Sequence, residues 1–573
     1  MQFEIEVNDE HVIARRGETI KNVLDRIGVK VPTLCHINGF TPTGNCRLCV
    51  VEVDGLPGLV PSCSHPVEEW MKIRTHTPRV LKARKTLVEL LLAGHPNDCL
   101  YCEKNGRCEL QELSYEMQIR ERKYQSRRIP VQIDKACPSI ERDPAKCILC
   151  ERCIRVCNEM IGVGAIEIIG RGSESRIGTT YNKGLNTNAC VKCGQCITVC
   201  PTGALIEKTA IHTVLEALNN PRLYPVVQFS PTLPAAIAEE FNLKSTKDVL
   251  NIVRAAMKKM GFRQVFDISM AADLTLMEEA AEIAERIRTQ EGLPFFTSCC
   301  PSWVRYVEEL KPVYLSSLST TRSPQQIMGR MIKQYITTSA GQKAEDVFVV
   351  SAMPCTAKKE EAGKDFIKDT QVPFVDAVLT NREIIKLIHL MGIDFSFLEP
   401  EPEDSAFSIR SSSGKLFGMA GGHLEGLIRT LHFQMTGQEM NPLKIQDLRG
   451  LKTRKEARIK IGKQIINVVS VSGLAHAKHL LEEIEAGRRE IHIVEVMACP
   501  YGCLNGGGQR QGADEKSLKS RMKILYDIDE EEIIKAAHKN PTITGLYENF
   551  LGKPNNDRDR EFLHVSRVAR QEK

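Results

Sequence analysis

Alternating apolar and polar positions open the chain. The stretch FEIEV alternates, the polar turn NDE follows, and HVIAR resumes the alternation, which predicts two paired strands. A short helical pattern then runs from Glu18 to Ile27. Together these patterns predict a small, half-open sheet packed on one helix.

Helical periodicity dominates the chain farther on. An apolar and basic helical stretch, RVLKARKTLVELLLAG, ends at Gly94. From about Ile211 onward, helical stretches alternate with the short apolar runs PVVQF, VFVVSAMP, INVVSVS and IHIVEVMAC. This alternation is typical of an α/β domain.

No apolar run is long enough for a membrane helix, and the first residues lack the apolar core of a signal peptide. We therefore expect a cytoplasmic protein without membrane insertion. A length of 573 residues predicts roughly four domains of about 150 residues each. The 77 basic and 72 acidic residues nearly balance, which does not favour nucleic-acid binding.

Cysteine usage changes this general picture. The chain has 21 cysteines, and cytosolic reductants keep thiols reduced, so metal thiolates are expected in place of disulfides. The first group keeps a CxxC pair and a distant fourth cysteine, as plant-type 2Fe-2S proteins do, but its first gap is ten residues instead of four. A four-cysteine zinc site is the alternative. The group consists of Cys35, Cys46, Cys49 and Cys63.

A second group lies in HPNDCLYCEKNGRC, which offers His95, Cys99, Cys102 and Cys108. One imidazole and three thiolates could hold a 4Fe-4S cluster or a zinc ion, and the spacing does not separate the two. A solvated loop histidine is a further alternative for His95.

Two repeats carry the clearest signal. CILCERCIRVC and CVKCGQCITVC both follow C-x2-C-x2-C-x3-C, the run of bacterial two-cluster ferredoxins, in which the fourth cysteine binds the other cluster. The paired repeat makes a zinc site improbable. With the two groups before it, it predicts a row of closely spaced clusters that conducts single electrons. One cluster is expected on Cys147, Cys150, Cys153 and Cys200, and the other on Cys190, Cys193, Cys196 and Cys157.

The five cysteines of the α/β part lie in TSCCPSW, AMPCTAKKEE and EVMACPYGCLNGGGQ. Loops at strand ends commonly build a site on an α/β core. One thiol of the adjacent pair Cys299 and Cys300, with Cys355, Cys499 and Cys503, would hold one more 4Fe-4S cluster and leave a spare thiol beside it. A buried structural cysteine with a glycine-rich turn is the alternative.

The three glycines at 506–508 are expected to let the backbone approach a bulky inorganic group. Cys137 in KACPSI has no assigned role and is expected to be an unreactive thiol that binds no metal.

The three cysteine motifs TSCCPSW, AMPCTAKKEE and EVMACPYGCLNGGGQ resemble the signature motifs of FeFe-hydrogenases. The resemblance to the clostridial type with four accessory clusters extends over the whole chain. It implies an H-cluster, a 4Fe-4S cube joined through one cysteine to a two-iron unit with CO, cyanide and an azadithiolate. By this resemblance, Cys300, Cys355 and Cys499 hold the cube and Cys503 bridges the two units.

The resemblance also implies a proton relay. Glu279, Glu282 and Arg286 share one face of a helical stretch. Without the resemblance, such a face is more often a solvated surface. The implied relay runs through Cys299, Glu279, Ser319, Glu282 and Arg286.

Further positions match the cavity of the family. Lys358 and Gln325 are implied to donate hydrogen bonds to cyanide and the bridging region. The water-excluding positions are Pro231, Pro324, Met353, Phe417 and Met497. The chain departs from the family pattern at Ser230, Thr232 and Pro234, of which Ser230 and Thr232 are also predicted cofactor-binding residues, and at His423, where an aliphatic residue is usual.

The expected architecture is a multidomain α/β and α+β protein. Its domains are a plant-type ferredoxin-like (β-grasp) 2Fe-2S domain (1–79), a His/Cys-ligated 4Fe-4S domain (80–126), a bacterial two-4Fe-4S ferredoxin-like domain (127–209) and a large α/β H-cluster domain (210–573). The cofactors would be one 2Fe-2S cluster, three accessory 4Fe-4S clusters and the H-cluster.

The resemblance implies reversible conversion of 2H+ and 2e- to H2 in an anaerobic hydrogen metabolism, with electrons from ferredoxin. The alternative is the catalytic subunit of an NADH-coupled or bifurcating complex. Partner subunits would then bring flavin and nucleotide, since the chain shows no Gly-rich dinucleotide loop. Maturation proteins would install the two-iron unit.

Two other classes of protein share parts of this sequence pattern. An electron-transfer subunit resembling the large iron-sulfur subunit of respiratory complex I would share the front part of the chain but lack the three cysteine motifs. An H2 sensor or iron-sulfur scaffold would share the fold, but sensors of this kind tend to lack a thiol at the position of Cys299.

Overall fold

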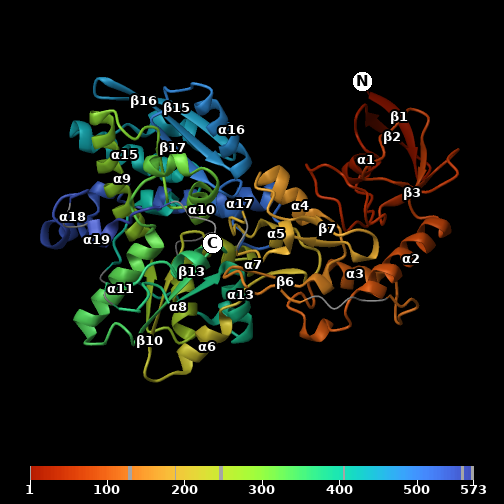
Figure 1. Ribbon diagram of the computed structural model, residues 1–573, viewed down its shortest axis with the longest axis horizontal. Helices are drawn as coiled ribbons and strands as arrows, with labels where there is room; N and C mark the ends of the chain where they lie inside the picture. Colours follow the sequence, from red (N-terminus) through yellow and green to blue (C-terminus); the bar gives the residue numbers. More distant parts are fainter. Residues whose placement is uncertain are drawn as a thin grey trace. The chain divides into compact units, whose positions relative to one another are not determined.

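The computed structural model describes residues 2–126, 132–186, 189–243, 249–368, 370–403, 407–556 and 560–568 (Figure 1). The chain divides into two compact units. The smaller comprises Met1–Glu159, Gly164–Asn188 and Val199–Ile206, and the larger Met160–Val163, Ala189–Thr198 and Glu207–Lys573. No helix among the described residues combines the length and apolar character that crossing a bilayer requires.

The N-terminal sheet of the smaller unit contains the predicted hairpin and helix. Its strand order is β2-β1-β5-β3-β4, and Ile20 and Leu24 of the helix are buried against it. The helix begins later than predicted because the Thr19 side chain accepts a hydrogen bond from the Asn22 backbone and caps it. The elements are β1 (Gln2–Val7), β2 (Glu10–Arg15), α1 (Ile20–Arg26), β3 (Val50–Val53), β4 (Val60–Pro61) and β5 (Lys72–Arg74).

Short elements joined by cysteine-bearing loops follow this sheet. They are α2 (Pro78–Gly94), α3 (Glu109–Glu116), β6 (Ile140–Arg142), α4 (Arg152–Arg155), β7 (Glu167–Ile169), β8 (Arg176–Gly178), α5 (Gln195–Val199) and β9 (Leu205–Glu207).

The larger unit contains two four-stranded sheets. In the first, of order β11-β10-β13-β14, all neighbours are parallel. Its central strands are apolar and buried, as parallel strands covered on both faces must be. The strands are β10 (Tyr224–Phe229), β11 (Gln264–Asp267), β13 (Val347–Met353) and β14 (Ala377–Thr380).

The second sheet has the order β12-β17-β16-β15. Its first three strands are parallel, and β15 pairs antiparallel with β16 at the edge. Buried and exposed positions roughly alternate along β15, as an edge strand with one solvated face requires. The strands are β12 (Phe295–Phe296), β15 (Arg454–Ile461), β16 (Gln464–Ser472) and β17 (Ile493–Met497).

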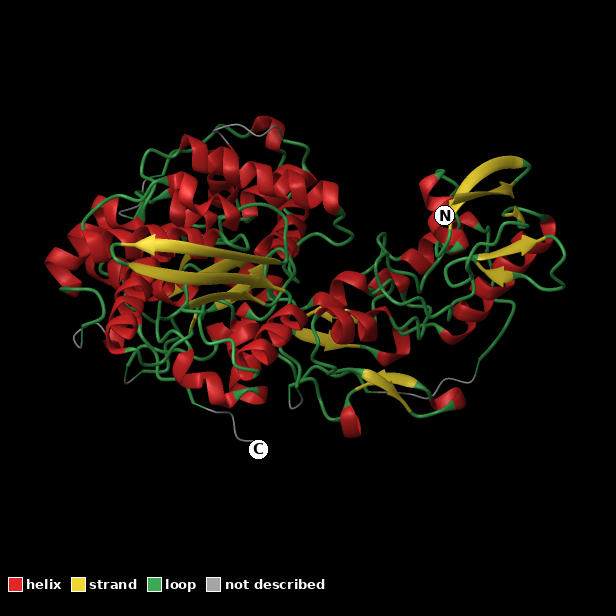
Figure 2. Ribbon diagram, turned by 90° about the horizontal axis from the view of Figure 1, so that it is seen from above, coloured by secondary structure: helices red, strands yellow, loops and turns green. Residues whose placement is uncertain are grey.

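Helices surround the strands of the larger unit (Figure 2). They are α6 (Ile211–Asn219), α7 (Leu233–Glu240), α8 (Val249–Lys259), α9 (Ser269–Thr289), α10 (Pro301–Leu310), α11 (Pro324–Ala340), α12 (Lys358–Ala362), α13 (Asn381–Leu390), α14 (Ser412–Leu416), α15 (Gly422–Thr436), α16 (Leu474–Glu485), α17 (Glu515–Glu531), α18 (Pro541–Leu546) and α19 (Arg560–Leu563). The predicted mixed α/β multidomain architecture is confirmed.

Four parallel strands, two from each sheet, end at the residues that the sequence singles out. Ser230 follows β10, Cys299 follows β12, Cys355 follows β13 and Cys499 follows β17. The carboxyl ends of parallel strands are where α/β folds build their sites, so this topology gathers the motifs.

Candidate active site

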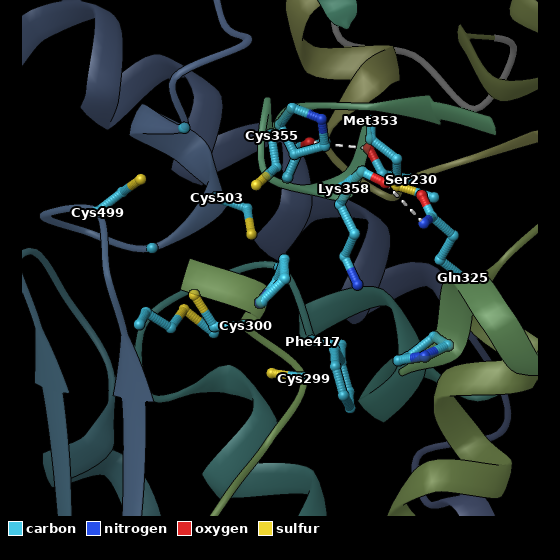
Figure 3. A pocket seen from close by; sticks show the side chains of 18 of the residues that line it. Ser230, Cys299, Cys300, Gln325, Met353, Cys355, Lys358, Phe417, Cys499 and Cys503 are labelled. Carbon is cyan, nitrogen blue, oxygen red and sulfur yellow. Dashed lines mark hydrogen bonds between the residues drawn. The ribbon is translucent and has the colours of Figure 1, made fainter. Parts of the chain in front are cut away.

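The loops after these four strands enclose one cavity of about 90 Å³ (Figure 3). A single water needs roughly 10–15 Å³ on this measure, so the cavity has room for a group of several heavy atoms. The predicted site residues that line it are Ser230, Pro231, Thr232, Cys299, Cys300, Pro324, Gln325, Met353, Cys355, Lys358, Phe417, Met497, Cys499 and Cys503.

Local backbone contacts place two of the four predicted cube ligands, Cys300 and Cys503. Cys300 is the N-cap residue of α10, and its Sγ accepts a hydrogen bond from the Ala498 backbone at 3.4 Å. Cys503 begins a short 3-10 turn, and its N–H donates to the Gly418 carbonyl at 2.9 Å. These bonds tie the motif loops to one another and to the α14–α15 connection.

The same thiols affect one another electrostatically. Burial and then the nearby Cys300 raise the pKa of Cys355 to about 12. Burial and then the neighbouring thiols Cys355 and Cys300 raise the pKa of Cys499 and of Cys503. Four thiolates can coexist here only beside a strongly cationic group. The donor set therefore fits an iron-sulfur cube.

The glycines at 506–508 have close backbone neighbours in addition to the predicted place beside the site. Gly506 lines the cavity, but a Cβ there would clash with the Pro354 carbonyl oxygen, and a Cβ at Gly507 would clash with the Cys193 carbonyl oxygen. A Cβ at Gly508 would stand 2.9 Å from the carbonyl carbon of Pro354. The glycines let this loop pack backbone against backbone on two other cysteine loops.

One of these loops is 189–198, which carries the second cysteine run. Burial and the charge of Cys499 raise the pKa of Cys193, so the two thiols are close. The Gln195 side-chain amide donates to the Asn505 carbonyl at 2.7 Å. The second cysteine run is thereby fastened to the 499–507 loop.

A buried lysine supplies positive charge to the cavity. Burial lowers the pKa of Lys358, but the Glu361 carboxylate, 2.6 Å from its Nζ, and nearby thiols outweigh this, so the pKa is raised and the ammonium persists. The Gln325 side-chain amide donates to the Lys358 carbonyl at 3.2 Å and to Glu361 at 3.1 Å. Gln325 thus lines the cavity while its N–H groups hold α12.

The rest of the wall is largely apolar. Pro231, Pro324, Met353, Phe417 and Met497 contribute side chains without hydrogen-bond donors. A wall of this kind disfavours water at the site. Two hydroxyls at the end of β10 interrupt it, those of Ser230 and Thr232, which bond to each other at 3.0 Å.

The predicted relay glutamates lie on α9. Glu279 is 0% exposed and Glu282 is 6% exposed, so this part of the helix is not a solvated surface. Arg286 is one turn farther along the same helix, and its guanidinium contacts Glu282 Oε1 at 2.6 Å.

Ser319 Oγ donates to Glu282 Oε2 at 3.4 Å, which joins the middle of the predicted relay. Burial raises the pKa of Glu282, although Arg286 lowers it in part. Arg286 also donates to the carbonyls of Leu318, at 3.0 Å, and Gly292, at 2.8 Å. The Glu282 carboxyl is therefore prone to hold a proton, and Arg286 lies at the less buried end of the predicted relay.

A histidine stands between the first two predicted relay residues. Nδ1 of His423 lies 3.4 Å from Sγ of Cys299, and Nε2 lies 2.5 Å from Oε2 of Glu279. The sequence marked His423 only as a departure from the family pattern. Its contacts could not be predicted because Cys299 and Glu279 are 124 and 144 positions away in the chain.

Family models match the chain in successive segments. The iron only hydrogenase large subunit, C-terminal domain, matches residues 224–507, and the iron hydrogenase small subunit matches 515–570. The sequence pattern did not separate residues 515–570 from the rest of the predicted domain 210–573. In front of these, a 2Fe-2S iron-sulfur cluster binding domain matches 1–78, the NADH-ubiquinone oxidoreductase-G iron-sulfur binding region matches 84–123, and the ferredoxin-like domain of NADH-quinone oxidoreductase subunit 3 matches 137–206.

Two relatives are similar over nearly the whole length. NADP-reducing hydrogenase subunit HndD of Solidesulfovibrio fructosivorans is 39% identical over 567 residues, which cover 97% of this chain and 97% of that protein. Iron hydrogenase 1 of Clostridium pasteurianum is 34% identical over 544 residues, covering 94% of each. This chain belongs to the FeFe-hydrogenase family.

A solved FeFe-hydrogenase has the same core. The E141Q variant of HydA1 from Chlamydomonas reinhardtii is 30% identical, with a TM-score of 0.56 over 63% of this chain and 98% of that one. The predicted family and the predicted class of enzyme, an oxidoreductase acting on hydrogen, are confirmed. The matches also favour iron-sulfur clusters over the zinc alternatives in the front part of this FeFe-hydrogenase.

The first cysteine group comes together in the smaller unit. Cys46 and Cys35 have their sulfur atoms 3.4 Å apart, and Cys63 hydrogen-bonds to both Cys35 and Cys49. The bond from Cys63 lowers the pKa of Cys49 to about 6. Four thiols this close suit the 2Fe-2S domain of the FeFe-hydrogenase.

The smaller unit contains another cavity, lined by Cys147, Cys150 and Cys153 of the first ferredoxin-like run and by Cys200 of the second. Burial raises the pKa of Cys147 to about 11 and that of Cys150 to about 12. These four are the residues grouped from the sequence.

The other predicted group divides between the units. Cys157 belongs to the smaller unit, where its Sγ accepts a hydrogen bond from Ala165 N at 3.3 Å, and Cys190, Cys193 and Cys196 belong to the larger. Their grouping stays a prediction.

The His/Cys group lies around the ends of α2 and α3. His95 is the C-cap residue of α2, with Nδ1 3.1 Å from the Pro96 carbonyl, and Cys108 is the N-cap residue of α3. Cys99 is exposed and Cys102 is half-buried. Across the described residues, no three His, Cys, Asp or Glu side chains are gathered closely enough for a single metal ion.

Proposed function

We propose that the chain catalyses the reversible reaction of two protons and two electrons to H2 at an H-cluster. Cys300, Cys355 and Cys499 would hold its cube and Cys503 would bridge to the two-iron unit. The observation that carries the proposal is the convergence of these thiols, Lys358 and the spare Cys299 on one apolar cavity at the ends of four parallel strands.

When bound, the two-iron unit supplies the metal site and the amine base that split or form H2. The chain supplies the surroundings. Lys358 presents an ammonium that suits a cyanide ligand, since its charge survives burial. The apolar wall keeps water away from the metal and strengthens these electrostatic interactions. The hydroxyls of Ser230 and Thr232 and the Gln325 side chain complete the polar positions of the wall.

Protons would move between the cavity and solvent through Cys299, Glu279, Ser319, Glu282 and Arg286. The buried carboxyls on α9 and the Ser319–Glu282–Arg286 hydrogen bonds support this relay. A carboxyl whose pKa burial has raised can hold and release a proton near neutral pH.

Electrons would move through one 2Fe-2S and three accessory 4Fe-4S clusters in the domains 1–79, 80–126 and 127–209. The run Cys190–Cys196 packs against the 499–507 loop, so its cluster would be the neighbour of the cube. Residues 210–573 would form the H-cluster domain.

The electron partner has two candidates. We infer that nucleotide-binding subunits, with flavin, deliver or accept the electrons, because a relative of nearly the same length is named a subunit of an NADP-reducing hydrogenase. Ferredoxin is the second candidate, supported by the similarity to iron hydrogenase 1. Either carrier fits a cytoplasmic enzyme.

Infrared spectroscopy and gas measurement test the chemistry together. Protein produced with FeFe-hydrogenase maturation proteins is expected to show CO and cyanide bands and to evolve H2 from reduced viologen. The variant Cys503→Ala should lose the bands. Absence of both bands and gas in the unmodified protein would overturn the proposal.

Purification of the native protein with its companions tests the partner. Nucleotide-binding subunits that co-purify and support nucleotide-dependent H2 formation would favour the multi-subunit form. Purification as a single chain, with ferredoxin alone as donor, would decide for ferredoxin.

A further inference from the structure

His423 is buried beside the cavity with its ring held in one orientation. It is 0% exposed and lies in the first turn of α15. The ring stacks on Phe417, a cavity residue, with 4.0 Å between the ring centroids and 22° between the planes. This packing restricts rotation of the ring, so the two nitrogens keep their neighbours.

Both ring nitrogens face groups that can exchange protons. Nε2 lies 2.5 Å from Glu279 Oε2, and Nδ1 lies 3.4 Å from Cys299 Sγ. If the Glu279 carboxylate accepts from Nε2–H, then Nδ1 of the neutral ring is an acceptor for the thiol. In that arrangement the ring has one tautomer and each hydrogen bond one direction, and the opposite tautomer reverses both.

Glu279 is prepared to pass a proton on. Among the described residues, its Oε1 is buried without a hydrogen-bond partner. Glu279 and Glu282 are three positions apart on α9 and therefore neighbours on one helix face. The histidine occupies one oxygen of Glu279 and leaves the other available toward Glu282.

We propose that His423 is a relay residue that carries protons between Cys299 and Glu279; this inference rests on the proposed hydrogenase function. In one passage, the Sγ–H bond of Cys299 breaks as an Nδ1–H bond forms, and the Nε2–H bond breaks as an O–H bond forms on Glu279. The thiolate takes its next proton from the cavity, and no electron is transferred. The ring must return to its first tautomer before the next passage.

A purely structural role of His423 would lead to a different result on substitution. If His423 only holds Glu279 in place, glutamine should substitute for it, because its side-chain amide can also donate to a carboxylate. Glutamine cannot take up a proton on one atom and release another, so it cannot carry a relay. His423→Gln and His423→Val therefore separate the two roles.

The chain offers a matched control in His538. Its ring stacks on Phe433, a residue of the same helix α15, at 4.1 Å between centroids, and its Nε2 lies 3.1 Å from a Glu439 carboxylate oxygen. His538→Gln changes a stacked histidine paired with a carboxylate, but one without a contact to the cavity.

The first measurement needs no H-cluster. In protein made without maturation proteins, the two thiols outside the proposed cluster ligands are Cys137 and Cys299, and Cys137→Ala leaves the S–H stretching band of Cys299 for infrared study. His423→Val should shift this band to higher frequency as the thiol loses its acceptor, and His538→Gln should not. A band that stays in place in His423→Val would overturn the proposed contact.

The second measurement uses the matured enzyme. Both His423 variants should evolve H2 about a hundredfold more slowly from reduced viologen, the scale of a lost proton-transfer group, with a larger solvent isotope effect and unchanged CO and cyanide bands. His538→Gln should match the unmodified enzyme. If His423→Gln evolved H2 as fast as the unmodified enzyme, the relay would be overturned and the hydrogenase function would remain supported. An inactive unmodified enzyme would overturn both, whatever the S–H band shows.

Discussion

Burial sets the protonation of the side chains around the cavity. It raises the pKa of Glu282 and of the cavity cysteine Cys355, whereas Lys358 stays charged because Glu361 is 2.6 Å away. A carboxyl that readily holds a proton and an ammonium that does not lose one have separate uses, proton transfer and anion binding.

Replacement of Glu282 tests the relay at its centre. Glu282→Gln keeps the size of the side chain but removes its proton exchange, so H2 evolution from reduced viologen should fall about a hundredfold. Glu285→Gln is the control, because Glu285 lies on the same helix and pairs with the exposed Arg288. Equal activity of the two variants would show that protons take another route.

The pH profile gives an independent test of the same carboxyl. Because burial raises the pKa of Glu282, its protonated form persists to higher pH than that of an ordinary glutamate. H2 evolution should decline as the pH rises through this raised pKa, and the step should vanish from the residual activity of Glu282→Gln. A step that stays in the variant would assign the titration to another group.

At the scale of elements, strand ends and close loop packing build the site. The apolar runs correctly predicted β10, β13, β16 and β17, because local patterning determines where a buried strand forms. The partners of Gly507 and His423 could not be predicted, since those contacts join segments that only the tertiary fold brings together. The approach of the glycines to a cofactor stays a prediction, and their close contact with the backbone of distant loops is a further constraint that the sequence did not show.

Gly507→Ala tests the packing of these loops. The added methyl group would overlap the Cys193 carbonyl oxygen, and overpacking of this kind costs about 1–3 kcal/mol. We expect a lower Tm and less bound iron. Gly545→Ala is the control, because the nearest atom to an added Cβ in α18 is 4.0 Å away and alanine favours a helix. Equal iron content and Tm in both variants would contradict the proposed close packing.

At the scale of the whole molecule, the proposed 2Fe-2S site and the cavity are assembled from different loops. The proposed 2Fe-2S ligands lie in the smaller unit, and the cavity thiols belong to the larger. Family patterns in the sequence predicted both groups, but not that the compact larger unit includes residues 189–198.

Loss of one cluster should therefore be local. Cys49→Ala should abolish the 2Fe-2S signal in electron paramagnetic resonance and leave the CO and cyanide bands of the matured enzyme in place. Cys137→Ala, at another buried cysteine, should change neither. Loss of the CO and cyanide bands in Cys49→Ala would show that the sites depend on each other.

Iron uptake should release protons. Without iron, burial holds Cys355 as a neutral thiol, with a pKa of about 12, so binding must displace its proton. Reconstitution of the iron-free protein in weak buffer should acidify the solution and proceed faster at higher pH. A rate independent of pH would show that deprotonation does not limit uptake.

The cavity draws on strands from two sheets, and the last of them, β17, is followed by Cys499 and Cys503. During synthesis a chain emerges from its N-terminus, so the ligands in the front part are exposed first. The cube site cannot close until residue 503 has left the ribosome. Iron delivery to the proposed catalytic centre is therefore expected late in the maturation of a newly made chain, after the accessory sites have had time to bind their clusters.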